Sequence, residues 1–476
     1  MKDTALQTRA SAKIALTDEF IDESFARVTG AELLRGNDVR LLIDAAENYP
    51  AWYAAIESAT ERIFFESYII HEDAEGERFA DALLKKAREG VEVKLIYDWM
   101  GGWGRTSRKF WKCLRAGGID VRCYNPPNFF DPLSLVSRDH RKVLVVDGRV
   151  AFVSGLCIGQ DWIGYPEKKI APWRDTGVEI RGAAVADVER AFADAWAMCG
   201  EPLDVSKLAR REDFPRAGNV ALRVVQNVPS NSHTYRLDLL LAAGVRETMW
   251  ITDAYFVGTP SYLEALKDAA LDGVDVRILV PQSTDIPIIR ETTRTTYRTL
   301  LEAGVRVFEW NGSMIHSKTA VFDGKFSRIG STNMNVASWF GNLELDVLVE
   351  DENFGRKMME MFLRDLENST EIVLADTVKP LPRRRKERRK GKGKGSVRKA
   401  TAGALNTATS IGSAITRKTP LGAAESRLLF LIGALILLFD VLLILFPRVF
   451  SIVIAVILLL PAVTILGKAF RYYKRN

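Results

Sequence analysis

The sequence contains two copies of one short pattern, H-x-K-x-x-x-x-D, and the rest of the chain repeats around them. The first copy is formed by His140, Lys142 and Asp147. The second is formed by His316, Lys318 and Asp323. Because side chains two residues apart in a strand point to the same face, each copy would present an imidazole and an ammonium group together. The chain has only four histidines, so two such patterns are far from what chance would give.

An apolar run follows each lysine and closes in a turn. Val143–Val146 and Thr319–Phe322 are each followed by the aspartate and then by glycine. Such runs predict buried strands that end in tight turns. We therefore predict that Asp147 and Asp323 stabilise these turns and have a structural role in the motif.

The two copies lie 176 residues apart, and the sequence before them repeats as well. In each half the pattern predicts a strand, a helix and a strand: Arg62–Ile70, Ala80–Glu89 and Val91–Tyr97, then Met249–Tyr255, Tyr262–Ala270 and Val274–Val280. Units of this kind indicate an α/β fold with parallel strands and flanking helices. The repeat is too long for a solenoid and predicts a duplicated domain.

Two imidazoles and two ammonium groups around one point suit a phosphodiester substrate. Such a substrate is anionic and poorly electrophilic, so attack requires charge neutralisation, a nucleophile and an acid for the leaving alkoxide. Lys142 and Lys318 would supply positive charge, and the histidines would supply the nucleophile and the acid through a phosphoryl-histidine intermediate. The sequence shows no pattern of metal ligands, so we predict a site with no metal and no other cofactor.

The net charge of +6 is unevenly distributed along the chain. Residues 1–382 carry a net charge of −10, residues 383–399 carry +10 and residues 400–476 carry +6. A nuclease usually has a basic surface on its working domain, so the acidic body argues against nucleic acid as the substrate. The four cysteines form no C-x-x-C pattern and are expected to be reduced thiols.

The C-terminal part differs in composition from the body. The basic stretch 383–399 predicts a flexible linker that attracts anionic headgroups. Beyond it, residues 428–446 and 449–467 are apolar-rich, and Pro447 separates them. Each segment is long enough to span a hydrocarbon core of roughly 30 Å, so we predict a transmembrane helical hairpin, or a re-entrant wedge because of Asp440. The flanking basic residues predict that both ends lie in the cytoplasm.

These motifs resemble the phospholipase D superfamily, and the resemblance to the bacterial cardiolipin synthases is closer. It is carried by the two H-x-K patterns and by further segments: Phe65–Asp73, Tyr97–Asp98, Trp173–Thr176, Asp253–Phe256 and Gly330–Glu344. The resemblance implies two phospholipase D-like α-β-α sandwich halves related by a pseudo-two-fold axis, followed by the helical hairpin. The expected divisions are a lead-in, two halves, a polybasic linker and the hairpin: 1–36, 37–214, 215–378, 379–426 and 427–470.

A histidine nucleophile must hold the right tautomer, and a carboxylate on its other ring nitrogen would fix it. Aligning the two halves places Arg174–Thr176 against Leu343–Leu345. We therefore predict that Asp175 pairs with His140 and that Glu344 pairs with His316.

The second copy carries the whole family pattern, and in it Ser331 and Asn333 are expected to bind the substrate phosphate. The first copy departs from the pattern, because Gly155 is followed by Leu156 and Cys157 where serine and asparagine are expected. The residues alone do not decide which histidine attacks. The resemblance favours His140 as the nucleophile and His316 as the acid and base.

The predicted function is that of a membrane-anchored phosphatidyltransferase. It would make cardiolipin from phosphatidylglycerol and a second phospholipid, with phosphatidylethanolamine as another candidate donor. The alternatives are a phospholipase D hydrolase that releases phosphatidic acid, a phosphodiesterase on nucleic acid and a lipid-binding scaffold with a dead site. The motif does not separate transfer from hydrolysis, since that choice depends on pocket shape. The expected partners are phospholipids and the cell (inner) membrane, with a cytoplasmic catalytic domain, no nucleic acid and no obligate protein partner.

Overall fold

The computed structural model describes residues 21–127 and 137–374, together with Leu445, Leu459 and Val463. The chain divides into two units. The first contains residues 1–126, 135–285 and 299–372, and it holds the strands and both H-x-K motifs. The second contains residues 127–134, 286–298 and 373–476, and its described part includes most of helix α8 (Pro287–Glu302).

The first half of the repeat alternates strands and helices and then forms a run of antiparallel strands. Its strands are β1 (Leu34–Ile43), β2 (Arg62–Ser67), β3 (Glu92–Asp98), β4 (Asp120–Tyr124), β5 (Lys142–Val146), β6 (Val150–Ser154) and β7 (Thr176–Arg181). Its helices are α2 (Asp44–Ser58), α3 (Ala74–Arg88), α4 (Arg108–Ala116) and α5 (Ala184–Met198), with short turns of helix at η2 (Gln160–Trp162) and η3 (Pro166–Lys168).

The second half has the same succession of elements. Its strands are β8 (Val220–Asn227), β9 (Thr248–Asp253), β10 (Asp275–Pro281), β11 (Arg306–Trp310), β12 (Lys318–Phe322), β13 (Phe326–Gly330), β14 (Glu344–Glu350) and β15 (Ser369–Ile372). Its helices are α6 (His233–Gly244), α7 (Pro260–Leu271), α8, α9 (Val336–Phe340) and α10 (Glu352–Glu367). Short helical turns η4 (Val205–Lys207) and η5 (Arg211–Asp213) precede this half.

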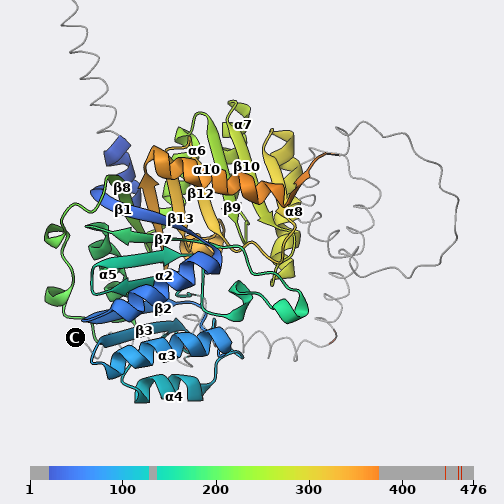
Figure 1. The fold of residues 1–476 in the computed structure, drawn as a ribbon. Coiled ribbons are helices and arrows are strands. Elements are labelled where there is room, and N and C mark those ends of the chain that lie inside the picture. The colour runs from blue at the N-terminus through green and yellow to red at the C-terminus, as the bar shows by residue number, and fades with distance from the viewer. Residues whose placement is uncertain (1–20, 128–136, 375–444, 446–458, 460–462, 464–476) are drawn as a thin grey trace, which may run out of the picture. The chain divides into compact units, whose positions relative to one another are not determined.

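The strands of the first unit form one hydrogen-bonded order, and that order shows the duplication. It runs β15-β11-β10-β9-β12-β13-β14-β8-β1-β7-β6-β5-β2-β3-β4. Outward from the β8–β1 junction, β14, β13, β12, β9, β10 and β11 take the same places as β7, β6, β5, β2, β3 and β4. Figure 1 shows the strands of the first half in blue to teal and those of the second half in green to orange. The predicted α/β fold and its repeat are confirmed at this level.

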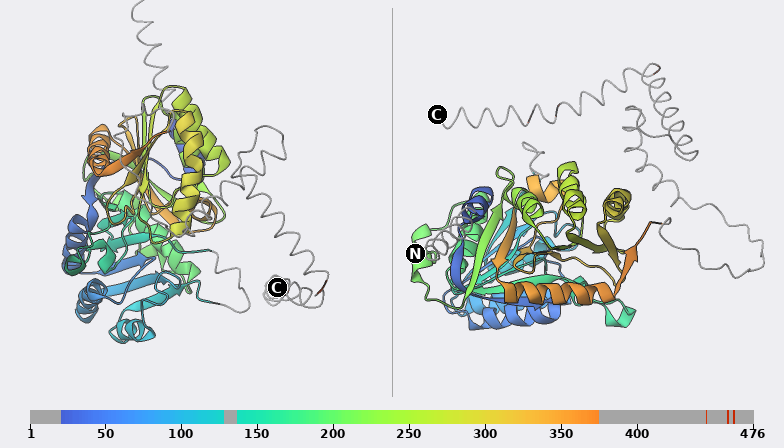
Figure 2. Two further views of the ribbon diagram at one scale, coloured as in Figure 1. Left: turned by 90° about the vertical axis from the view of Figure 1, so that its right-hand side faces the viewer. Right: turned by 90° about the horizontal axis from the view of Figure 1, so that it is seen from above.

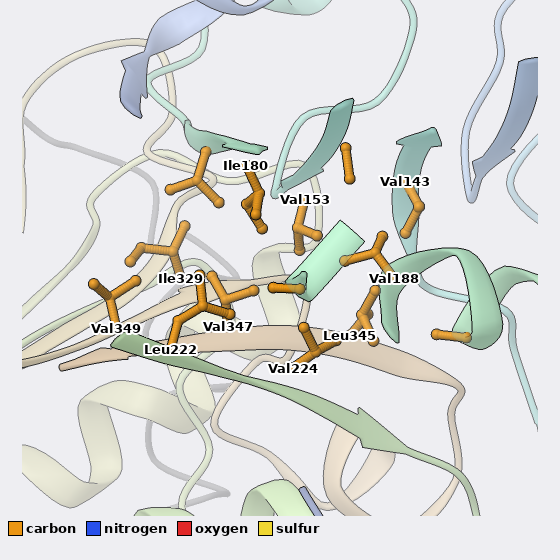
Figure 3. Packing of buried hydrophobic residues seen from close by; sticks show 14 of the residues in the cluster. Val143, Val153, Ile180, Val188, Leu222, Val224, Ile329, Leu345, Val347 and Val349 are labelled. Carbon is orange, nitrogen blue, oxygen red and sulfur yellow. The ribbon is translucent and has the colours of Figure 1, made fainter. Parts of the chain in front are cut away.

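Helices cover both faces of the sheet, so the strands are apolar on both sides. In β5, Val143 and Val145 face one hydrophobic cluster, whereas Leu144 and Val146 face another. The first cluster joins the two halves and includes side chains of α5 and α10. Figure 3 shows its valines, leucines and isoleucines from both halves packed face to face. In Figure 2, α6 and α7 cover one face of the second half and α10 covers the other.

Several predicted boundaries differ from those in the structure. β1 begins at Leu34, three residues before the predicted start of the first half. The apolar run from Arg62 ends as a strand at Ser67, because the chain then turns to enter α3. That helix begins at Ala74, earlier than predicted, because the Asp73 side chain accepts a hydrogen bond from the Gly76 amide and caps it.

The predicted linker 379–426 and nearly all of the predicted hairpin 427–470 lie outside the described residues. So do residues 1–20 of the lead-in, while residues 21–29 are helical. None of the helices in the described part of the chain has the length and apolar character needed to cross a membrane.

Candidate active site

The two H-x-K motifs occupy equivalent places at one edge of the sheet. β5 begins at Lys142, which pairs with Ser67 at the end of β2. β12 begins at Lys318, which pairs with Asp253 at the end of β9. The histidines immediately precede these strands. Both imidazoles and both ammonium groups are nearly buried, with side-chain neighbours from both halves.

Each histidine is bound by a carboxylate from the opposite half. Nδ1 of His140 donates to Oε2 of Glu344 at 2.9 Å, and Nδ1 of His316 donates to Oδ2 of Asp175 at 2.7 Å. The predicted pairing of Asp175 with His140 and of Glu344 with His316 is therefore wrong. The four residues are brought together as predicted, but their partners are exchanged.

Backbone pairing between the halves explains the exchange. The segment before His140 bridges in parallel to the segment before Glu344, through Asp139 and Leu343, and the His140 amide donates to the Leu343 carbonyl at 2.9 Å. In the same way the His316 amide donates to the Arg174 carbonyl at 2.7 Å. The acid that follows each bridge therefore reaches the histidine of the other half.

The lysines are held beside the histidines by short contacts. Nζ of Lys142 donates to the His140 carbonyl, and Nζ of Lys318 donates to the His316 carbonyl. Burial, together with the neighbouring Lys142, lowers the pKa of Lys318 to about 8. Burial also raises the pKa of the adjacent Asp253 to about 7, against the opposing charge of Lys318. An anionic substrate would raise the pKa of Lys318 again and hold it in the ammonium form, because a negative neighbour favours that form.

Burial lowers the pKa values of both histidines, to about 4 for His316. The positive charges of Lys142 and Lys318 each lower the pKa values of both histidines as well, so the four groups influence one another electrostatically. Burial alone would raise the pKa values of Asp175 and Glu344, but the contacts with the histidines and lysines hold them low. Each histidine therefore rests neutral, with its proton on Nδ1 and its Nε2 lone pair unprotonated.

The strand register corrects the alignment of the first copy. β5 and β6 pair Val143 with Val153, as β12 and β13 pair Thr319 with Ile329, so Gly155 takes the place of Ser331, and Cys157 takes that of Asn333. A Cβ at Gly155 would lie 2.2 Å from Oδ1 of Asp175. The close approach of Asp175 therefore explains why glycine stands where the second half has serine.

The Ser331 hydroxyl is occupied by protein contacts and is not free to donate to the substrate phosphate, contrary to the prediction. Its hydroxyl donates to Oε2 of Glu344 at 2.6 Å and accepts from the Leu345 amide at 3.0 Å, so its one proton is used on the carboxylate. The side-chain oxygen of Asn333 is buried and has no hydrogen-bond partner among the described residues. Cys157, at the equivalent place in the first half, is a fully buried free thiol.

Two tryptophans and two tyrosines complete the site, and the sequence did not reveal these roles. Nε1 of Trp162 donates to Oδ2 of Asp175 at 3.0 Å, which is the contact that Ser331 makes to Glu344. The rings of Trp162 and Trp173 lie 5.5 and 5.6 Å from the His316 ring. In the sequence, the one feature that could have indicated these roles is that Trp162 and Trp173 flank the loop that leads to Asp175.

The tyrosines lie on the chain just after β2 and β9. The Tyr68 ring contacts the His140 ring edge-to-face at 5.0 Å, and Nζ of Lys142 lies 5.2 Å from its centre. Tyr255 stands in the same relation to His316 and Lys318, at 5.9 and 5.6 Å. Each aromatic face stabilises an ammonium group and excludes water beside it.

Asp147 and Asp323 lie at the far ends of β5 and β12 from the histidines. The Asp147 carboxylate accepts the amides of Thr60, Glu61 and Arg62 at 2.8 to 2.9 Å. Asp323 accepts the equivalent three amides before β9. Both aspartates have positive φ values, near 50°, in the turns that follow their strands. Their contacts are those of turn and strand-start residues, away from the site.

Among the residues that the structure describes, no group of three or more histidine, cysteine, aspartate or glutamate side chains is placed to hold a metal ion.

The family described as "Cardiolipin synthase, PLD-like domain" matches residues 52–160 and 238–366, which are the two halves that carry the motifs. A cardiolipin synthase of Geobacillus sp. strain WCH70 is 31% identical over 350 residues, covering 73% of this chain and 69% of the relative. The chain belongs to the cardiolipin synthase family. Cardiolipin synthase of Listeria monocytogenes serotype 4a is 32% identical (72% of each chain), and cardiolipin synthase A of Pseudomonas putida is 31% identical (72% and 71%).

A solved structure shares the fold of this cardiolipin synthase family member. Phosphatidylserine synthase of Haemophilus influenzae Rd KW20 superposes with a TM-score of 0.58, at 16% identity, over 74% of this chain and 91% of that one. At this identity the likeness supports the duplicated α/β fold alone.

Proposed function

We propose that the protein is a phosphatidyltransferase that joins two phospholipids to make cardiolipin. The observation that carries the proposal is the pair of neutral histidines, each oriented by a carboxylate from the other half and each beside a buried lysine. Family membership supports the same activity, because the relatives are named cardiolipin synthases. The proposed substrate is phosphatidylglycerol, with phosphatidylethanolamine as a second candidate donor.

In the first proposed step, Nε2 of His140 attacks the phosphorus of the donor lipid. The bond from phosphorus to the headgroup oxygen breaks, and His316 gives a proton to the leaving alcohol. The products are free glycerol, or ethanolamine, and a phosphatidyl group on His140. His316 becomes protonated for this step because the bound phosphate anion raises its low pKa.

In the second proposed step, the terminal hydroxyl of a phosphatidylglycerol molecule attacks the same phosphorus. His316 takes the hydroxyl proton, the bond from phosphorus to Nε2 of His140 breaks, and cardiolipin leaves. In this proposal Lys142 and Lys318 neutralise the charge on the phosphoryl oxygens in both steps, and the side-chain NH2 group of Asn333 donates to one of them. Water in place of the lipid hydroxyl would give phosphatidic acid.

We also propose that residues 427–470 anchor the protein in the cell membrane as a helical hairpin, with the catalytic halves on the cytoplasmic side. The support is the length of the two apolar segments and the basic residues around them.

A product assay tests the proposed function. The full chain is reconstituted in vesicles of phosphatidylglycerol, alone and with phosphatidylethanolamine, and the lipids are identified by mass spectrometry. Cardiolipin with released glycerol supports transfer between two phosphatidylglycerol molecules, and released ethanolamine identifies the other donor. Phosphatidic acid without cardiolipin would replace the proposal with hydrolysis. The variant His316→Ala is the control that must form neither product.

A further inference from the structure

The loop Trp99–Ser107 lies at the same edge of the sheet as the site. β3 runs parallel to β2, so both strands end at the edge where β5 begins. The loop then packs directly on the segment after β2, because a Cβ at Gly101 would lie 1.9 Å from the carbonyl oxygen of Tyr68. The ring of Tyr68 contacts His140. The start of this loop is therefore one side chain away from the proposed nucleophile.

The tip of this loop exposes a large aromatic side chain. Trp103 is 68% exposed and stacks on Trp99, with ring centres 5.4 Å apart. A single exposed apolar side chain is common on soluble surfaces and by itself indicates no partner. An amphipathic indole ring is, however, the side chain most typical of the boundary between lipid headgroups and hydrocarbon.

The chain segment that contains Trp103 is basic, whereas the body as a whole is acidic. One exposed carboxylate, that of Glu72, lies against this segment and accepts the Ser107 amide at 2.7 Å. Residues 99–119 contain five basic residues and no acidic one, in a body whose net charge is −10. Arg105, Arg108 and Lys109 are exposed, close after Trp103 in the loop and the first turn of α4. A basic surface next to an exposed aromatic ring complements an anionic bilayer, to which each such residue adds electrostatic attraction.

A second exposed tip lies at the same edge. β6 runs back toward the site, and the chain after it forms a hairpin in which Tyr165 and Ile170 exchange backbone hydrogen bonds at 2.9 and 3.1 Å. Ile170 is 45% exposed, and Lys168 and Lys169 beside it are exposed. The base of this loop carries Trp162, whose ring contacts His316. The two tips therefore belong to loops near the two histidines: one packs on Tyr68, which contacts His140, and the other carries Trp162, which contacts His316.

We propose that these two tips, the segment 99–112 and the hairpin 165–170, form a docking surface for an anionic phospholipid bilayer. The inference rests on the proposed function and adds to it how the site reaches its substrate. The lipid headgroup must leave the bilayer to meet His140 and His316. Insertion of Trp103 and Ile170 on the edge that carries these histidines would hold the site against the membrane, independently of the C-terminal segments.

Enzyme kinetics on two forms of one substrate test the proposal. The full chain acts on vesicles of phosphatidylglycerol and, separately, on short-chain phosphatidylglycerol dispersed as monomers. The variants are Trp103→Ala and the triple change Arg105→Gln, Arg108→Gln and Lys109→Gln. We expect each to lower the vesicle rate at least about fivefold and to leave the monomer rate within about twofold. The matched control is Leu271→Ala, because Leu271 is also 68% exposed but ends the helix that leads to the opposite edge.

Three results would overturn the docking surface. One is an unchanged vesicle rate, and another is an equal loss on monomers and vesicles, which would place the effect in the site itself. The third is a loss that follows self-association of the protein, which would make the surface an interface between copies. Quenching of tryptophan fluorescence by brominated phosphatidylglycerol, compared between the wild type and Trp103→Phe, gives a readout that needs no turnover. Quenching attributable to Trp103 with no lipid turnover would retain the docking surface and contradict the proposed function.

Discussion

Glu344 in the second half binds His140 in the first, with Oε2 of the carboxylate 2.9 Å from Nδ1 of the ring. Asp175 and His316 form the reciprocal contact at 2.7 Å. Neither half therefore contains a complete histidine–carboxylate pair. The site is a product of both halves, and an activity that depends on it requires the two to be docked as the shared hydrophobic cluster holds them.

Glu344→Gln is expected to lower the rate about 10²- to 10⁴-fold while the fold is retained, because an amide does not hold the His140 tautomer as a carboxylate does. Asp175→Asn is expected to act on His316 in the same way. The measurement is kcat/KM for each variant, with circular dichroism as the test of folding. Glu352→Gln, an exposed glutamate in the first turn of α10, is the control and should retain full activity. Normal activity in Glu344→Gln would contradict the pairing.

Gly155→Ala is expected to abolish most activity, because the new methyl group would lie 2.2 Å from Oδ1 of Asp175 and displace the carboxylate from His316. Gly244→Ala is the matched control, since a Cβ there meets no atom within 4 Å. Initial rates and thermal melting curves of both variants distinguish a local effect from unfolding. An active Gly155→Ala enzyme would show that Asp175 need not remain in place.

The alkaline limb of the pH profile is expected to report Lys318. Its pKa is lowered to about 8, so the ammonium form is present below pH 8 and is lost as the pH rises through that value. On monomeric substrate, kcat/KM should therefore fall more steeply above about pH 8, where Lys318 loses its proton, than near neutral pH, where only the acid form of His316 is being depleted in the free enzyme. In the pH profile of kcat the corresponding fall should occur at a higher pH, because the phosphate of the bound substrate stabilises the ammonium form of Lys318.

Lys318→Arg is the variant that tests this assignment. A guanidinium stays protonated throughout the accessible range, so the alkaline limb should move upward even where the absolute rate falls. A limb that stays near pH 8 in this variant would assign it to another group.

Asp365→Asn is expected to lower the free energy of unfolding by about 3–5 kcal/mol, because it leaves the buried Arg174 without its main counter-charge. The two side chains form a fork, with Nε to Oδ1 at 2.9 Å and the second nitrogen to Oδ2 at 3.1 Å. Glu371→Gln removes a fork of similar geometry between exposed side chains, at 2.8 and 3.0 Å, and should cost less than about 1 kcal/mol. Urea unfolding measures both, and equal effects would contradict the account.

The sequence was sufficient to predict the elements that depend on local pattern. The two H-x-K strands, the β-α-β units and the convergence of the histidines, lysines and carboxylates follow from periodicity and from repetition of the motif. The carboxylate pairing did not follow, because it is set by backbone bridges between the halves, such as Arg174 with Ile315, which no single half encodes. Aligning the two halves shows which residues are equivalent, such as Asp175 and Glu344. It does not show which histidine each of these acids contacts, because each contacts the histidine of the other half.

The misplaced roles in the first copy have a similar cause. The sequence comparison matched Gly155 with Gly330, whereas in the structure Gly155 is equivalent to Ser331, one residue further on. Only the pairing of β5 with β6 establishes this register. The role of Ser331 was missed because its hydroxyl is used by Glu344, which lies thirteen residues further on. Trp162 takes over that contact in the first half, and nothing in the spacing of the motif indicates that an indole would replace a hydroxyl.

The measurement that tests the central claim most directly is the location of the covalent intermediate. Full-length His316→Ala enzyme is mixed with a short-chain phosphatidyl donor that carries a labelled phosphate and an activated leaving group, quenched at high pH to preserve phosphohistidine and mapped by peptide mass spectrometry. The activated leaving group needs no acid, so the intermediate can form in this variant. We predict label on His140, and none in the double variant His140→Ala, His316→Ala. Label on another residue, or cardiolipin formation by enzyme that lacks His140, would contradict the proposed two-histidine mechanism.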